Sequence, residues 1–299
     1  MIDFTDVRFG YRAGAPVLDG LSLRVAPGEV FGLIGANGAG KSTAIACLLG
    51  HLRPSLGAAT LAGRPLRNAH PAHRSRIAAV LQEAPLDASL SLDAHAAWLS
   101  PWFPRWNEAR RRHLGDRFQL PPDRPVGTFS GGQKRLAAVS LALAAEPEAL
   151  VLDEPAANLD PWNRRKLLEE LACLLADQPD MAVLYSTHLL ADLERLGTKA
   201  GWLAGGRLAF DLDLADLSTH WRHLTLIFDG PAPENFSLPG DLPVKTRGAV
   251  VTGIARFDSE TEREAFLALT PARIEANPVS LEDVFLHWQE RTEATQKPS

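Results

Sequence analysis

Short apolar runs alternate along the chain with stretches of helical periodicity. Residues 2–9 and 21–34 are rich in Val, Leu, Phe and Ile and predict strands, the second leading into a glycine-rich segment. Residues 149–153 and the apolar part of 181–188 have the continuous hydrophobicity of strands buried on both faces of a parallel sheet. Weaker strand signals occur at 58–61 and 77–81.

Helical segments separate these strands. One is predicted to follow the glycine-rich segment and to end near Arg53-Pro54, and another covers about 161–176. Helical spacing dominates residues 83–145, where Arg110–Arg112 predict a solvated helix face. Trp98, Trp102 and Trp106 share one helical face that Pro101 and Pro104 interrupt, which favours insert core or a docking surface. We expect an α/β fold with a parallel sheet and a helical insert.

The C-terminal part of the chain has a different pattern. Strands are predicted at 221–228 and 249–257, and helices at 261–269 and 280–290, the last with Ser280 as its N-cap. Two domains follow: residues 1–217, with a helical subdomain inserted at about 83–147, and a small α+β accessory domain at 218–299.

Composition narrows the class of protein. Hydrophobic residues make up 45% and charged residues 22%, which excludes a disordered or collagen-like chain. The net charge of -5 argues against a protein that coats nucleic acid, and no nucleic-acid partner is expected. Two cysteines, expected to be buried thiols, cannot form a disulfide framework. The chain shows neither a long apolar span nor a secretory signal, so we expect a cytoplasmic protein.

The strongest local motif is a glycine-rich loop between a predicted strand and a predicted helix. It fits G-x-x-x-x-G-K-[ST], in which glycines let backbone N–H groups surround phosphate oxygens at a helix N-terminus. The lysine reaches the β- and γ-phosphates, and the hydroxyl after it binds Mg²⁺. The candidate nucleotide-binding residues here are Gly35, Asn37, Gly38, Ala39, Gly40, Lys41, Ser42 and Thr43.

Polar residues at strand ends supply the rest of the chemistry. Asp153 and Glu154 end a buried strand, where α/β sheets place their ligands. Asp153 is a candidate Mg²⁺ partner, and Glu154 a candidate base for the attacking water. His188 ends another strand and is either structural or a γ-phosphate contact. Gln82 is either a surface amide or a residue that ligates Mg²⁺ or holds water.

Two further features have a structural and a functional interpretation. Ser130, Gly131, Gly132 and Gln133 precede a helical pattern and form either a simple N-cap or a second anion site. Two phosphate-binding helix starts in one chain suggest that they meet across a two-fold interface. Tyr11 is either a core aromatic or a platform for adenine.

Together these residues resemble the ATP-binding subunit of ABC transporters. The motifs stand in that family's order: Tyr11 as the A-loop, Gly35–Thr43 as Walker A and Gln82 as the Q-loop. Then follow the signature at Phe129–Gln133, Walker B at Leu150–Asp153 with Glu154, the D-loop at Asn158–Asp160 and His188 as the H-loop. The resemblance covers about residues 1–215.

The resemblance implies a P-loop fold with a mostly parallel core sheet, antiparallel N-terminal strands and a helical subdomain. It implies two ATP-Mg²⁺ sites in a head-to-tail dimer, each between one chain's phosphate loop and the signature of a second nucleotide-binding subunit, a homodimer. Glu154 would be the general base, His188 a γ-phosphate contact, and Asp160 a link between the two sites. Gln82 would connect ATP state to the helical insert, which docks on an integral membrane subunit.

The chain departs from the family pattern at Phe129, where Leu is usual, and at Asn158, where a small residue is usual. Neither change removes a catalytic group, so we expect a competent ATPase. The SLEDVFL ending and the tryptophan-containing insert resemble drug, antibiotic and polysaccharide exporters. The expected function is therefore export from the cytoplasmic face of the plasma membrane. The alternative is a soluble ABC ATPase that acts on ribosomes or nucleic acid.

Overall fold

The computed structural model describes residues 1–12, 14–83, 86–234, 236–240, 242, 244–269 and 273–296. The chain forms two compact units, Met1–Asp211 and Leu212–Ser299. Within the described residues, no helix is both long and apolar enough to cross a membrane.

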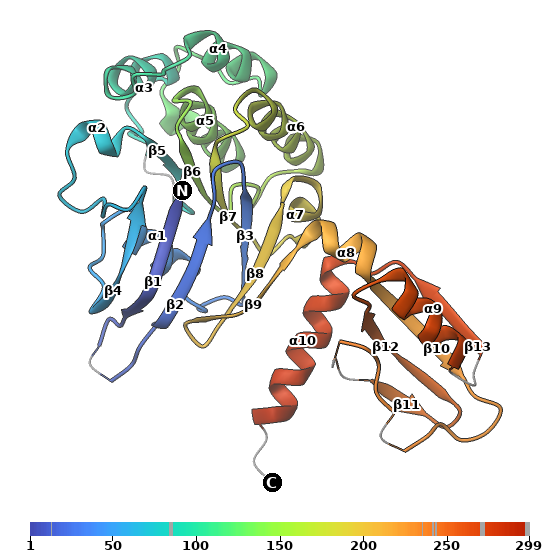
Figure 1. Cartoon of the computed structure of the whole chain (residues 1–299). Coiled ribbons are helices and arrows are strands. Elements are labelled where there is room, and N and C mark those ends of the chain that lie inside the picture. The colour runs from blue at the N-terminus through green and yellow to red at the C-terminus, as the bar shows by residue number, and fades with distance from the viewer. Residues whose placement is uncertain are drawn as a thin grey trace. The chain divides into compact units, whose positions relative to one another are not determined.

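A six-stranded sheet forms the centre of the first unit, in the order β5-β6-β7-β3-β8-β9 (Figure 1). The pairs from β5 through β8 are parallel, as predicted. Every residue of β3, β6 and β7 is buried, which explains their continuously apolar sequences. The strands are β3 (Val30–Ile34), β5 (Ile77–Val80), β6 (Ala149–Asp153), β7 (Ala182–Ser186), β8 (Lys199–Ala204) and β9 (Arg207–Asp213).

A separate antiparallel sheet in the order β2-β1-β4 packs beside it, and the two sheets share one core. Its strands are β1 (Ile2–Phe9), β2 (Leu18–Val25) and β4 (Leu56–Leu61). The single strand run expected at 21–34 was wrong, because residues 21–25 belong to this sheet and residues 30–34 to the central one. Pro27-Gly28 makes the turn between them, with Gly28 at φ +75°.

Helices cover the central sheet and form the insert. In the insert α4 packs on α5, and α5 packs on β5. The helix after the glycine-rich loop is shorter than predicted, since the left-handed Gly50 (φ +77°) follows its C-terminus. The helices are α1 (Lys41–Leu48), α2 (Pro71–Arg74), α3 (Leu92–Leu99), η1 (Ser100–Trp102), α4 (Glu108–Arg117), η2 (Val126–Thr128), α5 (Gly131–Ala144), α6 (Pro161–Asp177) and α7 (Leu190–Leu196).

Two expectations for side chains in this unit were wrong. Arg111 is buried rather than solvated, because its guanidinium pairs with Glu108 and Asp93, at 2.5 and 2.6 Å. Only Arg112 of the basic run is fully on the surface. Cys47 is buried as expected, but Cys173 is exposed on α6.

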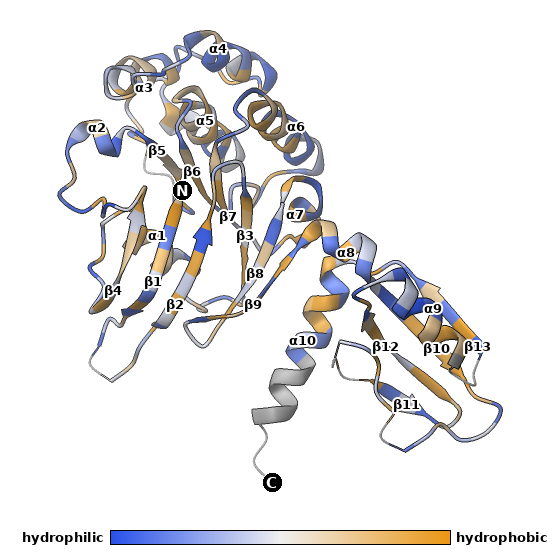
Figure 2. Ribbon diagram, in the orientation of Figure 1, coloured by the Kyte–Doolittle hydropathy of each residue, from blue (hydrophilic) through white to orange (hydrophobic). Residues whose placement is uncertain are grey.

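The second unit contains a four-stranded antiparallel sheet in the order β11-β12-β10-β13. Hydrophobic residues concentrate on β10 and β12 (Figure 2). Ser280 caps α10 as predicted: its hydroxyl accepts from the backbone N–H of Asp283 at 3.1 Å. The elements are α8 (Leu214–His220), β10 (Trp221–Ile227), β11 (Lys245–Arg247), β12 (Val250–Arg256), α9 (Glu260–Leu269), β13 (Arg273–Asn277) and α10 (Leu281–Gln296).

Candidate functional site

The glycine-rich loop joins β3 to the N-terminus of α1. Gly38 and Gly40 adopt left-handed backbone conformations, with φ of +82° and +107°. A Cβ at Gly40 would meet the side chain of Leu18 at 2.9 Å, so a larger residue would be both strained and crowded. Ala36, Asn37 and Gly38 are exposed, which leaves the outer side of the loop open to a ligand.

Lys41 supplies a buried cation at the base of this loop. Its Nζ donates to the backbone carbonyl oxygens of Gly35, at 2.7 Å, and Ala36, at 3.3 Å. Burial lowers the pKa of the Lys41 ammonium, and the carboxylates of Glu154 and Asp153 oppose that shift. The ammonium therefore lies in the field of both acidic residues, which belong to the end of β6.

Asp153 is an orphaned acceptor. Its side chain belongs to a residue that is 2% exposed, and its Oδ1 is buried without a hydrogen-bond partner in the described structure. A buried carboxylate oxygen without a donor is costly unless a cation or proton satisfies it. The arrangement therefore fits a metal ion beside the loop. Among the described residues, no group of three or more His, Cys, Asp or Glu side chains is arranged to hold a metal ion.

Glu154 and His188 form a pair at the ends of β6 and β7. Glu154 Oε2 lies 2.7 Å from His188 Nδ1. The Glu154 backbone is left-handed, at φ +52°, and its N–H donates to the carbonyl of Ser186 at 2.9 Å. This backbone conformation turns the buried glutamate toward the histidine, whose side chain is largely exposed.

The side chain of Tyr11, which follows β1, reaches the first turn of α1. Its hydroxyl is 3.5 Å from Thr43 Oγ1, and its ring meets Phe9 edge-on, with centroids 5.0 Å apart. Tyr11 is 68% exposed, so it is not a core aromatic. An exposed ring beside the phosphate loop can stack on a planar base.

Gln82 follows β5 with an exposed side chain, and its backbone is tied to α5 by a residue that sequence reasoning missed. The buried guanidinium of Arg135 donates to the backbone carbonyls of Leu81 and Gln82. Burial lowers the pKa of Arg135, and Asp153 and Glu154 counteract that effect. The only signal in the sequence was a second basic residue, next to Lys134, directly before the mainly apolar part of α5.

The two remaining motifs, Ser130–Gln133 and Asn158–Asp160, lie next to each other rather than at the phosphate loop. Ser130 and Gln133 form a reciprocal capping box at the start of α5. A Cβ at Gly132 would lie 3.5 Å from the Leu159 side chain, so this helix start adjoins the segment before α6. Among the described residues, no hydrogen bond or ion pair joins Ser130–Gln133 to Gly35–Thr43 of the same chain.

Asp160 caps α6, accepting from the backbone N–H groups of Trp162 and Asn163, both at 3.0 Å. These bonds lower the pKa of its carboxyl.

Asp192, on α7 after His188, is joined to α6 by an ion pair with Arg164. Its buried carboxylate lies 2.7 Å from Arg164 Nη2 and accepts from the Tyr185 hydroxyl at 3.4 Å. The segments after Asp160 and after His188 are thus joined by one ion pair.

We predict that Asp192→Asn destabilises the first unit by about 2–3 kcal/mol, because it leaves Arg164 unpaired next to a buried site. Thermal unfolding and amide hydrogen exchange in α7 measure this loss. The matched control is Asp177→Asn, which breaks a pair with Arg110 but whose carboxylate is well exposed. Surface pairs contribute only about 0–1 kcal/mol. Equal effects of the two variants would contradict the assigned role of Asp192.

The family model and the curated relatives that match this chain indicate the same family. Residues 18–157 match the family model described as ABC transporter. The Nod factor export ATP-binding protein I of Burkholderia lata is 32% identical over 297 residues, which cover 95% of each chain. The protein of that name from Rhizobium meliloti is 33% identical, covering 95% of this chain and 87% of its own.

Solved structures agree with the relatives. The structure of an ATP-binding subunit of an ABC transporter is 29% identical with a TM-score of 0.66, covering 73% of this chain and 91% of that one. A bacterial Atm1-family ABC exporter with ATP bound is 25% identical with a TM-score of 0.63, covering 72% of this chain and 39% of the exporter.

Proposed function

The chain belongs to the family of ATP-binding subunits of ABC transporters, and we propose that its hydrolysis of ATP drives export through a separately encoded membrane subunit. The observation that carries this function is the convergence of Lys41, Asp153, Glu154 and His188 beside an open glycine-rich loop. The word export in the names of the relatives supports the direction.

ATP would lie on the loop Gly35–Thr43, with its phosphates facing the backbone N–H groups at the start of α1 and its adenine on Tyr11. The Lys41 ammonium would exchange its carbonyl contacts for phosphate oxygens. Ser42, Asp153 and Gln82 would hold Mg²⁺, which neutralises charge on the β- and γ-phosphates. Mg²⁺ needs few protein ligands when phosphates supply others, and the orphaned Asp153 Oδ1 fits that requirement.

Glu154 is the proposed general base. Its carboxylate would accept a proton from the water that attacks the γ-phosphorus, in line with the leaving ADP oxygen. His188 holds that carboxylate through the 2.7 Å contact and would itself contact the γ-phosphate. The base is therefore oriented before the substrate arrives, which reduces the entropy cost of the step.

The Ser130–Gln133 segment would complete the site of a second nucleotide-binding subunit, most simply a second copy of this chain. It presents a helix N-terminus and two glycines without side chains, and it contacts its own phosphate loop through no hydrogen bond among the described residues. In such a dimer Asp160 would link the two sites, since its segment adjoins Gly132.

An apolar groove of about 370 Å³ supports docking on a membrane subunit. It lies between β5 and α5 and is lined by Leu81, Leu99 and Phe103 among others. The carbonyl of Leu81, like that of Gln82 next to it, accepts from Arg135. A membrane-subunit segment bound in this groove would respond to the position of Gln82.

We propose that residues 1–217 form the nucleotide-binding domain and residues 218–299 an accessory domain. The complex would lie at the cytoplasmic face of the plasma membrane.

Purification of the tagged chain from its host in mild detergent tests the transporter assignment. The expected result is a stoichiometric polytopic membrane protein in the purified complex. Recovery with ribosomes or nucleic acid instead would overturn the transporter assignment and favour a soluble ABC ATPase.

For the adenine contact, we predict that Tyr11→Ala raises the KM for ATP about five-fold and leaves kcat nearly unchanged. An exposed stacking contact contributes about 1 kcal/mol, at the lower end for base–aromatic stacking. Tyr11→Phe is the control, because it keeps the ring and removes only the contact with Thr43. Steady-state ATPase assays measure both parameters. Loss of affinity in Tyr11→Phe equal to that in Tyr11→Ala would assign the effect to the hydroxyl.

A further inference from the structure

A long part of the first unit lacks acidic residues. No aspartate or glutamate occurs between Glu29 and Glu83, although the whole chain has a net charge of -5. The exposed positive and imidazole side chains of this segment, here called the basic rim, are His51, Arg53, Arg64, Arg67, His70 and Arg74. Positive charge is therefore concentrated on one part of an otherwise acidic protein.

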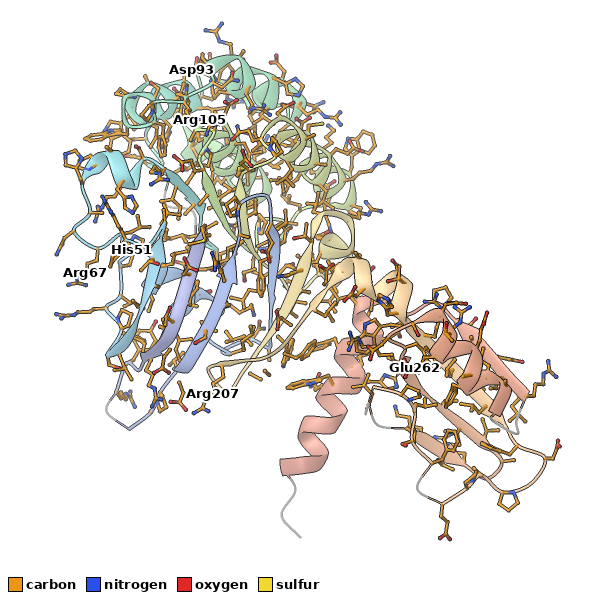
Figure 3. All side chains as sticks on the ribbon, viewed as in Figure 1. His51, Arg67, Asp93, Arg105, Arg207 and Glu262 are labelled. Atoms are coloured by element: carbon orange, nitrogen blue, oxygen red, sulfur yellow. The ribbon has the colours of Figure 1, made fainter. Side chains whose placement is uncertain are left out.

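Four residues of the basic rim line two neighbouring hollows. Arg53 and Arg67 line a cavity of about 630 Å³ between the end of α1 and β4. His51 and Arg74 line the apolar groove beside α5, and Leu66 contributes to both hollows. His51 and Arg67 project on the same side of the unit, near β4 and α2 (Figure 3).

The arginines of the rim have no acidic partner among the described residues. The only side-chain hydrogen bond that the structure gives one of them is from Arg74 to the carbonyl of Leu66, at 3.3 Å. Carboxylates on the adjacent strand β1 are engaged elsewhere: Asp3 with Arg24 and Asp6 with Arg8, both at 3.5 Å. The charge of Arg53, Arg64 and Arg67 is thus available to an external anion.

We propose that the basic rim binds the phosphate headgroups of anionic lipids in the membrane that holds the transport subunit, a proposal that rests on the proposed function. Guanidinium groups bind phosphate through two parallel hydrogen bonds, and the cavity lies within the roughly 300–1,000 Å³ of small-molecule sites. The basic rim borders the groove assigned to the membrane subunit, so docking there brings the arginines toward the lipid surface.

Lipid is favoured over an acidic protein segment by the charge of membrane proteins. Their short cytoplasmic loops carry an excess of lysine and arginine, so a loop docked in the groove leaves the guanidinium groups of Arg53, Arg64 and Arg67 without an acidic partner. The cytoplasmic leaflet carries a negative surface potential and attracts such a cluster.

Vesicle co-sedimentation of the full chain tests the proposal. We expect binding to phosphatidylcholine vesicles containing about one-third phosphatidylglycerol, weak binding to pure phosphatidylcholine, and loss of binding at high salt. Arg53→Gln/Arg64→Gln/Arg67→Gln should weaken binding roughly a hundred-fold, because each arginine near an anionic surface contributes about five-fold. The control Arg124→Gln/Arg195→Gln/Arg247→Gln removes the same charge from exposed positions outside the basic rim and should bind as wild type.

Equal loss in the two triple variants, or no preference for anionic vesicles, would overturn the proposal. Competition by soluble glycerol 1-phosphate at millimolar concentration would assign the cavity to a free phosphate compound instead. Stronger retention on polyglutamate than on vesicles would assign the basic rim to an acidic protein. The ATPase rate in solution separates this proposal from the proposed function: the first triple variant should hydrolyse ATP normally, and a chain that binds vesicles without hydrolysing ATP would contradict only the ATPase assignment.

Discussion

Phosphate release by Glu154→Gln is expected to fall about 10²- to 10³-fold below that of the wild type, with ATP binding retained. Loss of a general base typically costs this much, and glutamine keeps the shape of the side chain without a proton-accepting carboxylate. The 2.7 Å contact with His188 Nδ1 can persist through the amide oxygen, so the geometry of the site survives. A coupled phosphate assay at saturating ATP measures the change in kcat.

Glu169→Gln is the matched control, since Glu169 pairs with Arg165 and Arg117 on the exposed side of α6, away from the phosphate loop. Its rate should equal that of the wild type. Equal rates for wild type and Glu154→Gln would remove Glu154 from the reaction and leave the general base unassigned. Loss of ATP binding in Glu154→Gln would instead indicate a damaged site, and direct nucleotide titration separates the two outcomes.

The predicted strand ends explain why the proposed catalytic residues could be selected from the sequence alone. Asp153 and Glu154 follow a continuously apolar run, and such runs in an α/β protein form adjacent parallel strands. Parallel strands end at one edge of the sheet. His188, just after β7, was therefore expected at the same edge as Glu154, just after β6, and the pairing of β6 with β7 makes the two residues neighbours.

The side-chain partners that hold this edge in place were beyond prediction. Arg135 reaches the Leu81 and Gln82 carbonyls only because α5 packs against β5, and no local pattern specifies that contact. Arg111 was expected on the surface because it stands in a run of arginines, but Glu108 and Asp93 allow it to be buried. Both are charged residues whose burial depends on specific partners: Glu108 and Asp93 for Arg111, and the carbonyls after β5 for Arg135.

The same limit applies to the signature segment. Within one chain Ser130–Gln133 form a capped helix start that adjoins Leu159, and among the described residues no hydrogen bond or ion pair joins this segment to Gly35–Thr43. Its order among the motifs indicates a role that one chain cannot fulfil alone. The proposed two-fold assembly therefore needs its own test, which distinguishes the loss of the helix cap from the blocking of the subunit interface.

Glu154→Gln with ATP and Mg²⁺ should trap a dimer that light scattering detects, because ATP would close both sites and the slowed hydrolysis would delay their reopening. Adding Ser130→Arg to that variant should abolish the dimer, since a long cationic side chain would occupy the position proposed for the other subunit's γ-phosphate. The matched change is Ser130→Ala, which removes the cap bond to Gln133 but adds no bulk. The loss of an N-cap costs about 0.5–2 kcal/mol.

The Ser130→Ala chain should therefore remain folded and form the trapped dimer with reduced affinity, whereas Ser130→Arg should remain folded, bind ATP and stay monomeric. Circular dichroism and nucleotide titration check the folding and the binding of each variant. A trapped dimer that survives Ser130→Arg would exclude this segment from the interface. A dimer lost to the same extent in both variants would assign the effect to the helix cap. Other groups of the second subunit would then have to complete the phosphate-binding site.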